Sequence, residues 1–163
     1  MPDAPSTLPM PVLHLCSDFA NQNIYTQLVR HLHAAGIQQR VFAAVRSQAE
    51  VDRQPADEAP NLLFDIRNVL HPRHRILFGS KIRLTCRTVE QRGWPASCGL
   101  MHAHFLYSDG AAAQRLARRH SVPFITAVRN SDLFTFMKYR PDLWPRAKAV
   151  LRDASAVVFL TPA

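Results

Sequence analysis

Short runs of apolar residues alternate along this chain with longer stretches in which apolar side chains recur at helical spacing. The apolar runs predict buried β-strands at residues 12–16, 40–45, 62–66, 100–106, 124–128 and 156–160. Between the first two, Ile24, Leu28 and Leu32 repeat at helical spacing, and Gly36 stands where a left-handed helix cap is expected. Residues 111–119 and a segment capped by Asp142 predict two more helices.

Strands that alternate with helices, several of them continuous apolar runs, are typical of a parallel sheet covered on both faces. The sequence therefore predicts one α/β domain over residues 1–163, a Rossmann-like parallel sheet of about six strands. Residues 48–60 have no clear periodicity and predict a surface loop. In such sheets ligands gather at the carboxyl ends of the strands, which points to residues 17–23, 104–110 and 129–132.

Residues 72–94 mix arginines with apolar side chains and have two interpretations. They form either a basic helix on a membrane surface or a solvated helix that flanks the sheet. Charged and apolar residues do not separate cleanly on a helical wheel, and Gly79-Ser80 is a possible interruption.

The net charge and the sequence motifs argue against several classes of protein. The net charge of +8 and the pI near 10.3 call for an anionic partner, and the absence of a nucleic-acid-binding motif argues against nucleic acid. There is neither a G-x-G-x-x-G after the first strand nor a G-x-x-x-x-G-K-[ST], which argues against dinucleotide dehydrogenases and P-loop phosphotransferases. Without a signal peptide or a membrane-spanning run, we expect a cytoplasmic protein with reduced cysteines, peripheral on the inner membrane face at most.

The second half of the chain carries three distinctive segments: His102-Ala103-His104 leading to Asp109-Gly110, a strand that ends in Arg129-Asn130-Ser131-Asp132, and an apolar strand that runs into Thr161-Pro162-Ala163. In this order and spacing they resemble the N-terminal domain of family-four retaining glycosyltransferases, which have the two-domain GT-B architecture. The likeness is closest over residues 98–163 and looser over 11–46. Where many members have a glycine-rich loop after the first strand, this chain has residues 17–23, and Arg129-Asn130 replaces a His-Gly pair.

The resemblance implies transfer of a sugar from a nucleotide-diphosphate donor to a sugar or lipid-linked acceptor, with retention and without a cofactor or metal. It also implies that the C-terminal nucleotide-sugar domain is absent from this chain and is its partner, so that the fragment alone is inactive. An anionic membrane surface is a further possible partner. The alternative is a non-catalytic Rossmann-like module that binds a phosphorylated small molecule.

Among individual residues, the resemblance assigns the catalytic role to His104, facing the interdomain cleft and meeting the donor sugar or the departing phosphate. His102 and His104 lie two apart on a predicted strand and share a face, but a metal site would need more ligands, and Asp109 is the only obvious neighbour. An arginine at a strand end suits anion recognition. The residues expected to bind substrate are Asn21, Gln22, Asp109, Arg129, Asn130, Asp132 and Lys138.

Overall fold

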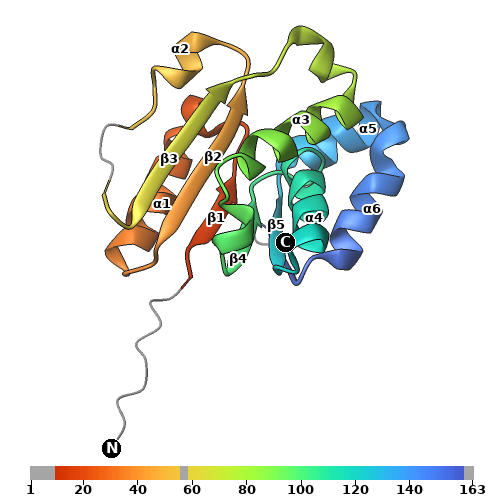
Figure 1. The fold of residues 1–163 in the computed structure, drawn as a ribbon. Coiled ribbons are helices and arrows are strands. Elements are labelled where there is room, and N and C mark those ends of the chain that lie inside the picture. Colours follow the sequence, from red (N-terminus) through yellow and green to blue (C-terminus); the bar gives the residue numbers. More distant parts are fainter. Residues whose placement is uncertain (1–9, 56–58, 160–163) are drawn as a thin grey trace, which may run out of the picture.

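A computed structural model describes residues 10–55 and 59–159 of the chain (Figure 1). One six-stranded sheet runs in the order β3-β2-β1-β4-β5-β6, and every neighbouring pair is parallel. The strands are β1 (Val12–Leu15), β2 (Gln39–Val45), β3 (Leu62–Asn68), β4 (Leu100–Ala103), β5 (Phe124–Val128) and β6 (Ala156–Phe159). The predicted α/β architecture is confirmed.

Helices cover both faces of the sheet because successive strand residues point to opposite sides. Val41 and Ala43 of β2 pack with Val29 of α1 (Asn23–Ala34) in one apolar cluster. Phe42 and Ala44 of the same strand belong to a larger cluster on the other face. That cluster also holds the apolar sides of α3 (Phe78–Glu90), α4 (Asp109–His120) and α6 (Trp144–Asp153), which lie together in Figure 1.

Short helical turns connect these elements. They are η1 (Phe19–Asn21), α2 (Gln48–Val51), η2 (Pro72–Arg75), η3 (Pro95–Ser97), the π-helical η4 (Asp132–Phe136), α5 (Met137–Tyr139) and η5 (Pro141–Leu143). Most of them follow the carboxyl end of a strand, the edge at which the candidate site lies.

Strand four is shorter than predicted. It ends at Ala103 rather than at residue 106, since the chain turns there toward α4 and the N–H of Gly110 donates to the Phe105 carbonyl at 2.7 Å. Leu106, the last residue of the predicted strand, is buried in this turn and does not continue the strand. The last residue of the predicted sixth strand, Leu160, lies outside the described residues.

The predicted loop at 48–60 is wrong at its start, where residues 48–51 form α2. Ser47 Oγ accepts from the Glu50 N–H at 3.3 Å, and the Glu50 carboxylate accepts from the Ser47 N–H at 3.1 Å. This reciprocal capping box stabilises a single turn of helix that has no apolar periodicity. Residues 56–58 of the segment are outside the described part.

The predicted cap by Asp142 is also wrong. The Asp142 carboxylate pairs with Arg140, at 2.9 Å from Nε and 2.8 Å from Nη2, so it is occupied before the helix begins. Helix α6 instead starts at Trp144 with Pro145 in its first turn, where a missing N–H has no cost.

The basic segment at residues 72–94 contains a helix that flanks the sheet, which is one of the two interpretations of its sequence. Helix α3 runs unbroken through Gly79-Ser80, and Ile82, Cys86 and Val89 on its apolar side are buried in the core. Those side chains are therefore not free to enter a membrane. Within residues 10–55 and 59–159, no helix is both long and apolar enough to cross a bilayer. The three cysteines are free and buried.

Candidate functional site

A cleft of about 400 Å³ opens at the carboxyl edge of the sheet. Its wall combines hydrogen-bonding side chains, cations and aromatic rings, which come from the segments that follow β1, β2, β3, β4 and β5 and from the start of α3. The residues that line it are Ser17, Asp18, Asn21, Gln22, Arg46, Glu50, Arg75, Phe78, Lys81, Phe105, Tyr107, Ser108, Ser131, Asp132 and Phe136. All three segments expected from the strand-end rule contribute to this list.

The rim beyond β1 is a network of amides and carboxylates. Asn21 Nδ2 donates to Asp18 Oδ1 at 2.9 Å and to Glu50 Oε1 at 3.0 Å, and Gln22 Nε2 donates to Asp18 Oδ2 at 2.7 Å. Burial alone would raise the pKa of Glu50, but hydrogen bonds from Asn21, Arg46 and Ser47 hold it below its usual value. The sequence-predicted Asn21 and Gln22 thus lie at the cleft, with Asn21 fixed by the helix α2 that the sequence interpretation missed.

Three cations face the cleft from different elements: Arg46 follows β2, Arg75 ends η2 and Lys81 lies in α3. Burial and then the charge of Arg75 lower the pKa of Arg46, and burial lowers that of Lys81 with a contribution from Arg46. Among the described residues, the buried Nε of Arg46 has no hydrogen-bond partner. Neighbouring positive charges make each other's protonated form less favourable, and one N–H donor here has no acceptor. This is the arrangement expected of a site that binds an anion.

Asp109 lies just behind this wall, at the start of α4 and only 4% exposed. Its Oδ2 accepts from the Ser17 N–H at 3.0 Å, and its Oδ1 accepts from Ser108 Oγ at 3.2 Å. Burial raises the pKa of Asp109 to about 6, against the opposing effects of the Lys81 charge and of these hydrogen bonds. Asp109 therefore holds the β1 loop in place and supplies the nearby negative charge for Lys81.

Asp132 lines the cleft where the resemblance suggested a substrate contact. Its Oδ2 accepts from the N–H of Arg129 at 2.9 Å and from that of Leu106 at 3.3 Å, which joins the turns after β4 and β5. Burial raises the pKa of Asp132 despite these bonds. Its Oδ1 is buried and has no hydrogen-bond partner among the described residues.

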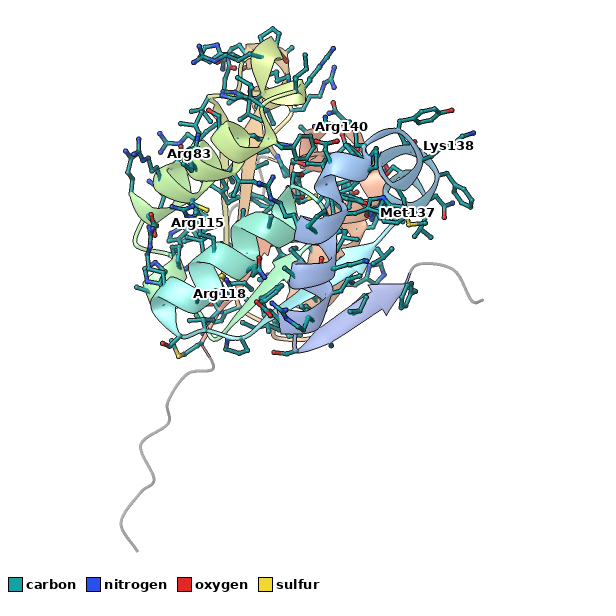
Figure 2. The ribbon with its side chains drawn as sticks, turned by 90° about the vertical axis from the view of Figure 1, so that its right-hand side faces the viewer. Arg83, Arg115, Arg118, Met137, Lys138 and Arg140 are labelled. Carbon is teal, nitrogen blue, oxygen red and sulfur yellow. The ribbon has the colours of Figure 1, made fainter. Side chains whose placement is uncertain are left out.

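Arg129 does not line the cleft. Its guanidinium lies 4.5 Å from the ring centroid of Tyr25 and 5.2 Å from that of Phe105, an arrangement in which the ring faces stabilise the cation. Asn130 is exposed, and Lys138 projects from α5 away from the body of the domain (Figure 2). Neither Asn130 nor Lys138 lines the cleft, so the substrate-binding roles of these three residues remain predictions.

His104 is 2% exposed and lies behind the cleft rather than on its wall. Its Nε2 is 3.0 Å from His14 Nδ1, its ring stacks on His102 with centroids 4.1 Å apart, and Tyr25 meets its ring edge-on. Burial lowers the pKa of all three histidines, to about 3 for His14 and about 4 for His102, so they are neutral imidazoles near neutral pH.

The histidine cluster also bears on metal binding. One ring nitrogen from each of His14, His102 and His104 lies within 4.8 Å of the others, so the third candidate ligand is His14 and not the expected Asp109. Neutral imidazoles are the form that binds zinc. The positive charge of Arg129 nevertheless reaches His102 and His104, where it lowers their pKa, and it disfavours a second cation at the same place.

Sequence reasoning missed Arg46, Arg75, Lys81 and His14. Arg46 directly follows a predicted strand, so the rule that pointed to the other three segments also applied to it. His14 pairs with His102 across neighbouring strands β1 and β4, a register that the sequence does not display. Lys81 carried no local signal beyond membership of a basic segment.

A family profile and one solved structure agree with this architecture. The sequence profile of the family described as "Glycosyl transferase 4-like domain" matches residues 22–163. The structure of Arabidopsis thaliana UGT89C1 complexed with UDP is similar with a TM-score of 0.65 and 12% identity, over 93% of this chain and 45% of that one. Gre2 from Candida albicans reaches a TM-score of 0.42 and 13% identity, over 74% of this chain and 36% of that one. No curated protein sequence matches the chain.

Proposed function

The chain belongs to the glycosyl transferase 4-like domain family, and from this we propose that it is the N-terminal, acceptor-side half of a GT-B glycosyltransferase. The whole enzyme would move a sugar from a nucleotide-diphosphate donor to a sugar or lipid-linked acceptor, with retention. The chain spans 45% of the length of the UGT89C1 chain that it resembles. A second domain that binds the nucleotide would complete the enzyme, and residues 1–163 alone would be inactive.

The observation that carries the proposal is the convergence of Arg46, Arg75 and Lys81 on a cleft at the carboxyl edge of the sheet. Guanidinium and ammonium groups bind phosphate through charge-assisted hydrogen bonds. Their neighbours Asn21, Gln22 and Asp132 offer the hydrogen-bonding groups that sugar hydroxyls need. An acceptor that carries both hydroxyls and a phosphate fits this combination.

In the proposed reaction the residues of this chain bind and orient the acceptor. The cleft cations would hold its phosphate, or meet the negative charge that develops on the donor diphosphate as the glycosidic bond breaks. The acceptor hydroxyl attacks the anomeric carbon from the face that the diphosphate leaves, and its proton passes to the departing phosphate oxygen. The family route requires no side-chain nucleophile, no cofactor and no metal from this domain.

His104 fits a positioning role better than direct contact with the sugar. It is buried behind Phe105, a residue of the cleft wall that directly follows it in the chain. The contacts of His104 with His14 and His102 would fix the backbone at this point and thereby the position of the Phe105 ring. Replacement of His104 would then weaken substrate binding because the Phe105 ring in the cleft wall would be displaced.

The other candidate function is a non-catalytic module that binds a phosphorylated small molecule. The three cations of the cleft, Arg46, Arg75 and Lys81, favour any phosphate ligand, whether or not a sugar is transferred. The two functions differ in one respect: a binding module holds its ligand tightly by itself, whereas half of a glycosyltransferase needs its second domain.

The test is sugar transfer by the full-length protein from labelled nucleotide-diphosphate sugars to phosphate-bearing acceptors. Arg46→Gln should raise KM for the acceptor or lower kcat by about tenfold or more, the equivalent of one lost charge-assisted bond. Arg73→Gln, an exposed change of the same charge outside the cleft, is the matched control and should leave both constants unchanged. Transfer that is insensitive to Arg46→Gln would contradict the proposed site, and tight phosphate-ligand binding without transfer from any donor would favour the binding module.

A further inference from the structure

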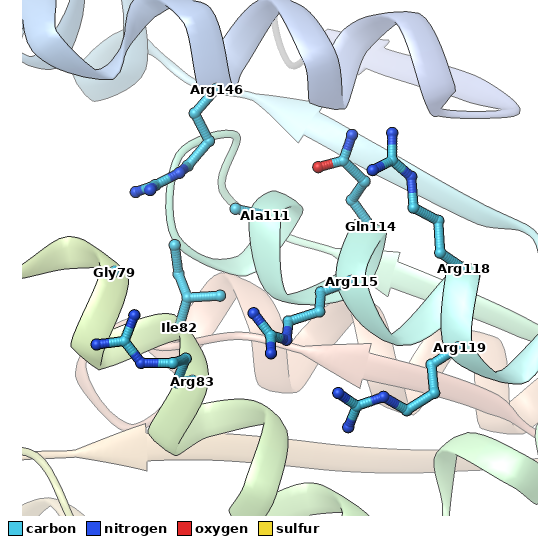
Figure 3. A pocket seen from close by; sticks show the side chains of 9 residues that line it. All are labelled: Gly79, Ile82, Arg83, Ala111, Gln114, Arg115, Arg118, Arg119 and Arg146. Atoms are coloured by element: carbon cyan, nitrogen blue, oxygen red, sulfur yellow. The ribbon is translucent and has the colours of Figure 1, made fainter.

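A second hollow, of about 570 Å³, lies on the outer surface of the helices that cover one face of the sheet (Figure 3). Five arginines line it: Arg83 from α3, Arg115, Arg118 and Arg119 from α4, and Arg146 from α6. We call it the arginine groove. It has no lining residue in common with the cleft at the sheet edge, so nothing in the proposed function explains it.

The two ends of the arginine groove differ in how their charges are neutralised. Arg118 pairs with Asp153, and Arg119 donates to both oxygens of Glu90 at 2.6 and 2.8 Å. Arg83, Arg115 and Arg146 form no ion pair with any carboxylate in the described part of the chain. Figure 3 shows the Arg146 side chain directed toward the start of α3, where the Arg83 guanidinium group also lies, and the Arg115 side chain directed from α4 toward α3.

The guanidinium groups of Arg83 and Arg146 both lie close to Gly79, in the first turn of α3. A Cβ at Gly79 would lie 3.5 Å from Arg83 Nη1 and 4.0 Å from Arg146 Nη2, so both guanidinium groups reach the same point. Unpaired like charges in such proximity repel each other, and the partial positive charge at the start of α3 adds to the field. A bound anion converts this repulsion into attraction.

The number and origin of the donors indicate which anion. Each guanidinium presents a planar fork of N–H donors, and here three forks approach from three different helices. A carboxylate has two oxygens in one plane, whereas a phosphate has three or four oxygens directed to different sides. A phosphate group can therefore accept from Arg83, Arg115 and Arg146 together, which a carboxylate cannot do equally well.

We propose that the arginine groove is a second binding site, for a phosphate-bearing ligand, with one phosphate held by Arg83, Arg115 and Arg146. Such a phosphate has two sources, the headgroup of an anionic phospholipid and a soluble phosphorylated molecule. The groove is open to solvent on the helical surface, so both can reach it (Figure 2). The site is separate from the cleft and does not depend on the proposed enzymatic function.

The experiment titrates the full chain with two probes. Inorganic pyrophosphate, followed by calorimetry, represents the soluble source, and sedimentation with phosphatidylglycerol-containing vesicles, against pure phosphatidylcholine vesicles, represents the membrane source. The test variant is Arg83→Gln with Arg115→Gln, both exposed positions. The control is Arg73→Gln with Lys148→Gln, which removes the same charge from exposed positions outside the groove. Arg46→Gln reports on pyrophosphate bound in the cleft.

We expect the groove variant to lose about tenfold or more in affinity for at least one probe, while the control changes by less than about twofold. Loss for pyrophosphate alone identifies a soluble ligand, and loss for the anionic vesicles alone identifies a lipid headgroup. The proposal is overturned if neither probe binds the unmodified chain, if test and control variants weaken binding equally, or if only Arg46→Gln does. Equal melting temperatures of the variants verify that each remains folded.

Discussion

The carboxylate of Asp109 accepts a hydrogen bond from the backbone N–H of Ser17 at 3.0 Å, and this bond joins the loop after β1 to the first turn of α4. Two segments separated by ninety-two residues in the sequence thereby meet at the cleft. Because Asp109 is nearly inaccessible to water, burial disfavours its charged form, so its contribution to the stability of the protein depends on pH.

Replacement of Asp109 by Asn should change how stability depends on pH. Burial raises the pKa of Asp109 from 3.8 to about 6, so the folded protein binds a proton in this range that the unfolded chain has released. The Asp109 contribution to stability is therefore lost as pH rises from about 4 to about 6, by up to about 3 kcal/mol, and Asp109→Asn should lack this contribution at every pH. Urea unfolding of both proteins at a series of pH values measures the difference. Parallel curves would exclude the raised pKa.

His14 should affect stability at acidic pH in the opposite direction. Burial lowers the pKa of His14 from 6.5 to about 3, so between these pH values the unfolded chain binds a proton that the folded protein does not bind. Its contribution is present above pH 6.5 and is lost as pH falls toward about 3, at about 1.4 kcal/mol per pH unit. His14→Asn, whose amide can replace the bond to His104, should reduce that slope by one proton. The free energy of unfolding of both proteins is measured by thermal unfolding between about pH 6 and pH 4. If its slope against pH is the same in His14→Asn and in the wild type, the neutral histidine cluster is contradicted.

Gly110 tests how tightly α4 is packed against the sheet. A Cβ at this position would lie 2.9 Å from Val150 Cγ1, 3.1 Å from Thr126 Oγ1 and 3.2 Å from the Phe105 carbonyl oxygen. Gly110→Ala should therefore lower the free energy of unfolding by about 1–3 kcal/mol, measured by chemical denaturation. Gly79→Ala is the matched control, because its nearest contact is an ordinary 3.5 Å to the end of the Arg83 side chain. The control should be neutral or stabilising by up to about 1 kcal/mol, and equal losses in the two variants would indicate a general effect of the substitution.

Most of the fold could be predicted from the sequence, because apolar periodicity reports directly on which side of an element is buried. Six strand positions, the helices between them and the parallel sheet all follow from that pattern. The errors lie where polar bonds override it. Helix α2 depends on the bonds between Ser47 and Glu50, a capping-box spacing that was present in the sequence but accompanied by no apolar run. Asp142 was expected to cap a helix, but Arg140, two residues earlier, binds its carboxylate.

Which segments reach the carboxyl edge of the sheet follows from the sequence alone, since every parallel strand ends there and the chain must continue from that point. Which side chains face the cleft, and which are buried behind it, depends on how distant elements pack in the folded protein. Side-chain direction after a strand depends on packing against distant elements: His104 turns toward His14, whereas Asp132 faces the cleft. The arginine groove likewise requires α3, α4 and α6 to pack side by side, because its charges come from helices that no local sequence pattern connects.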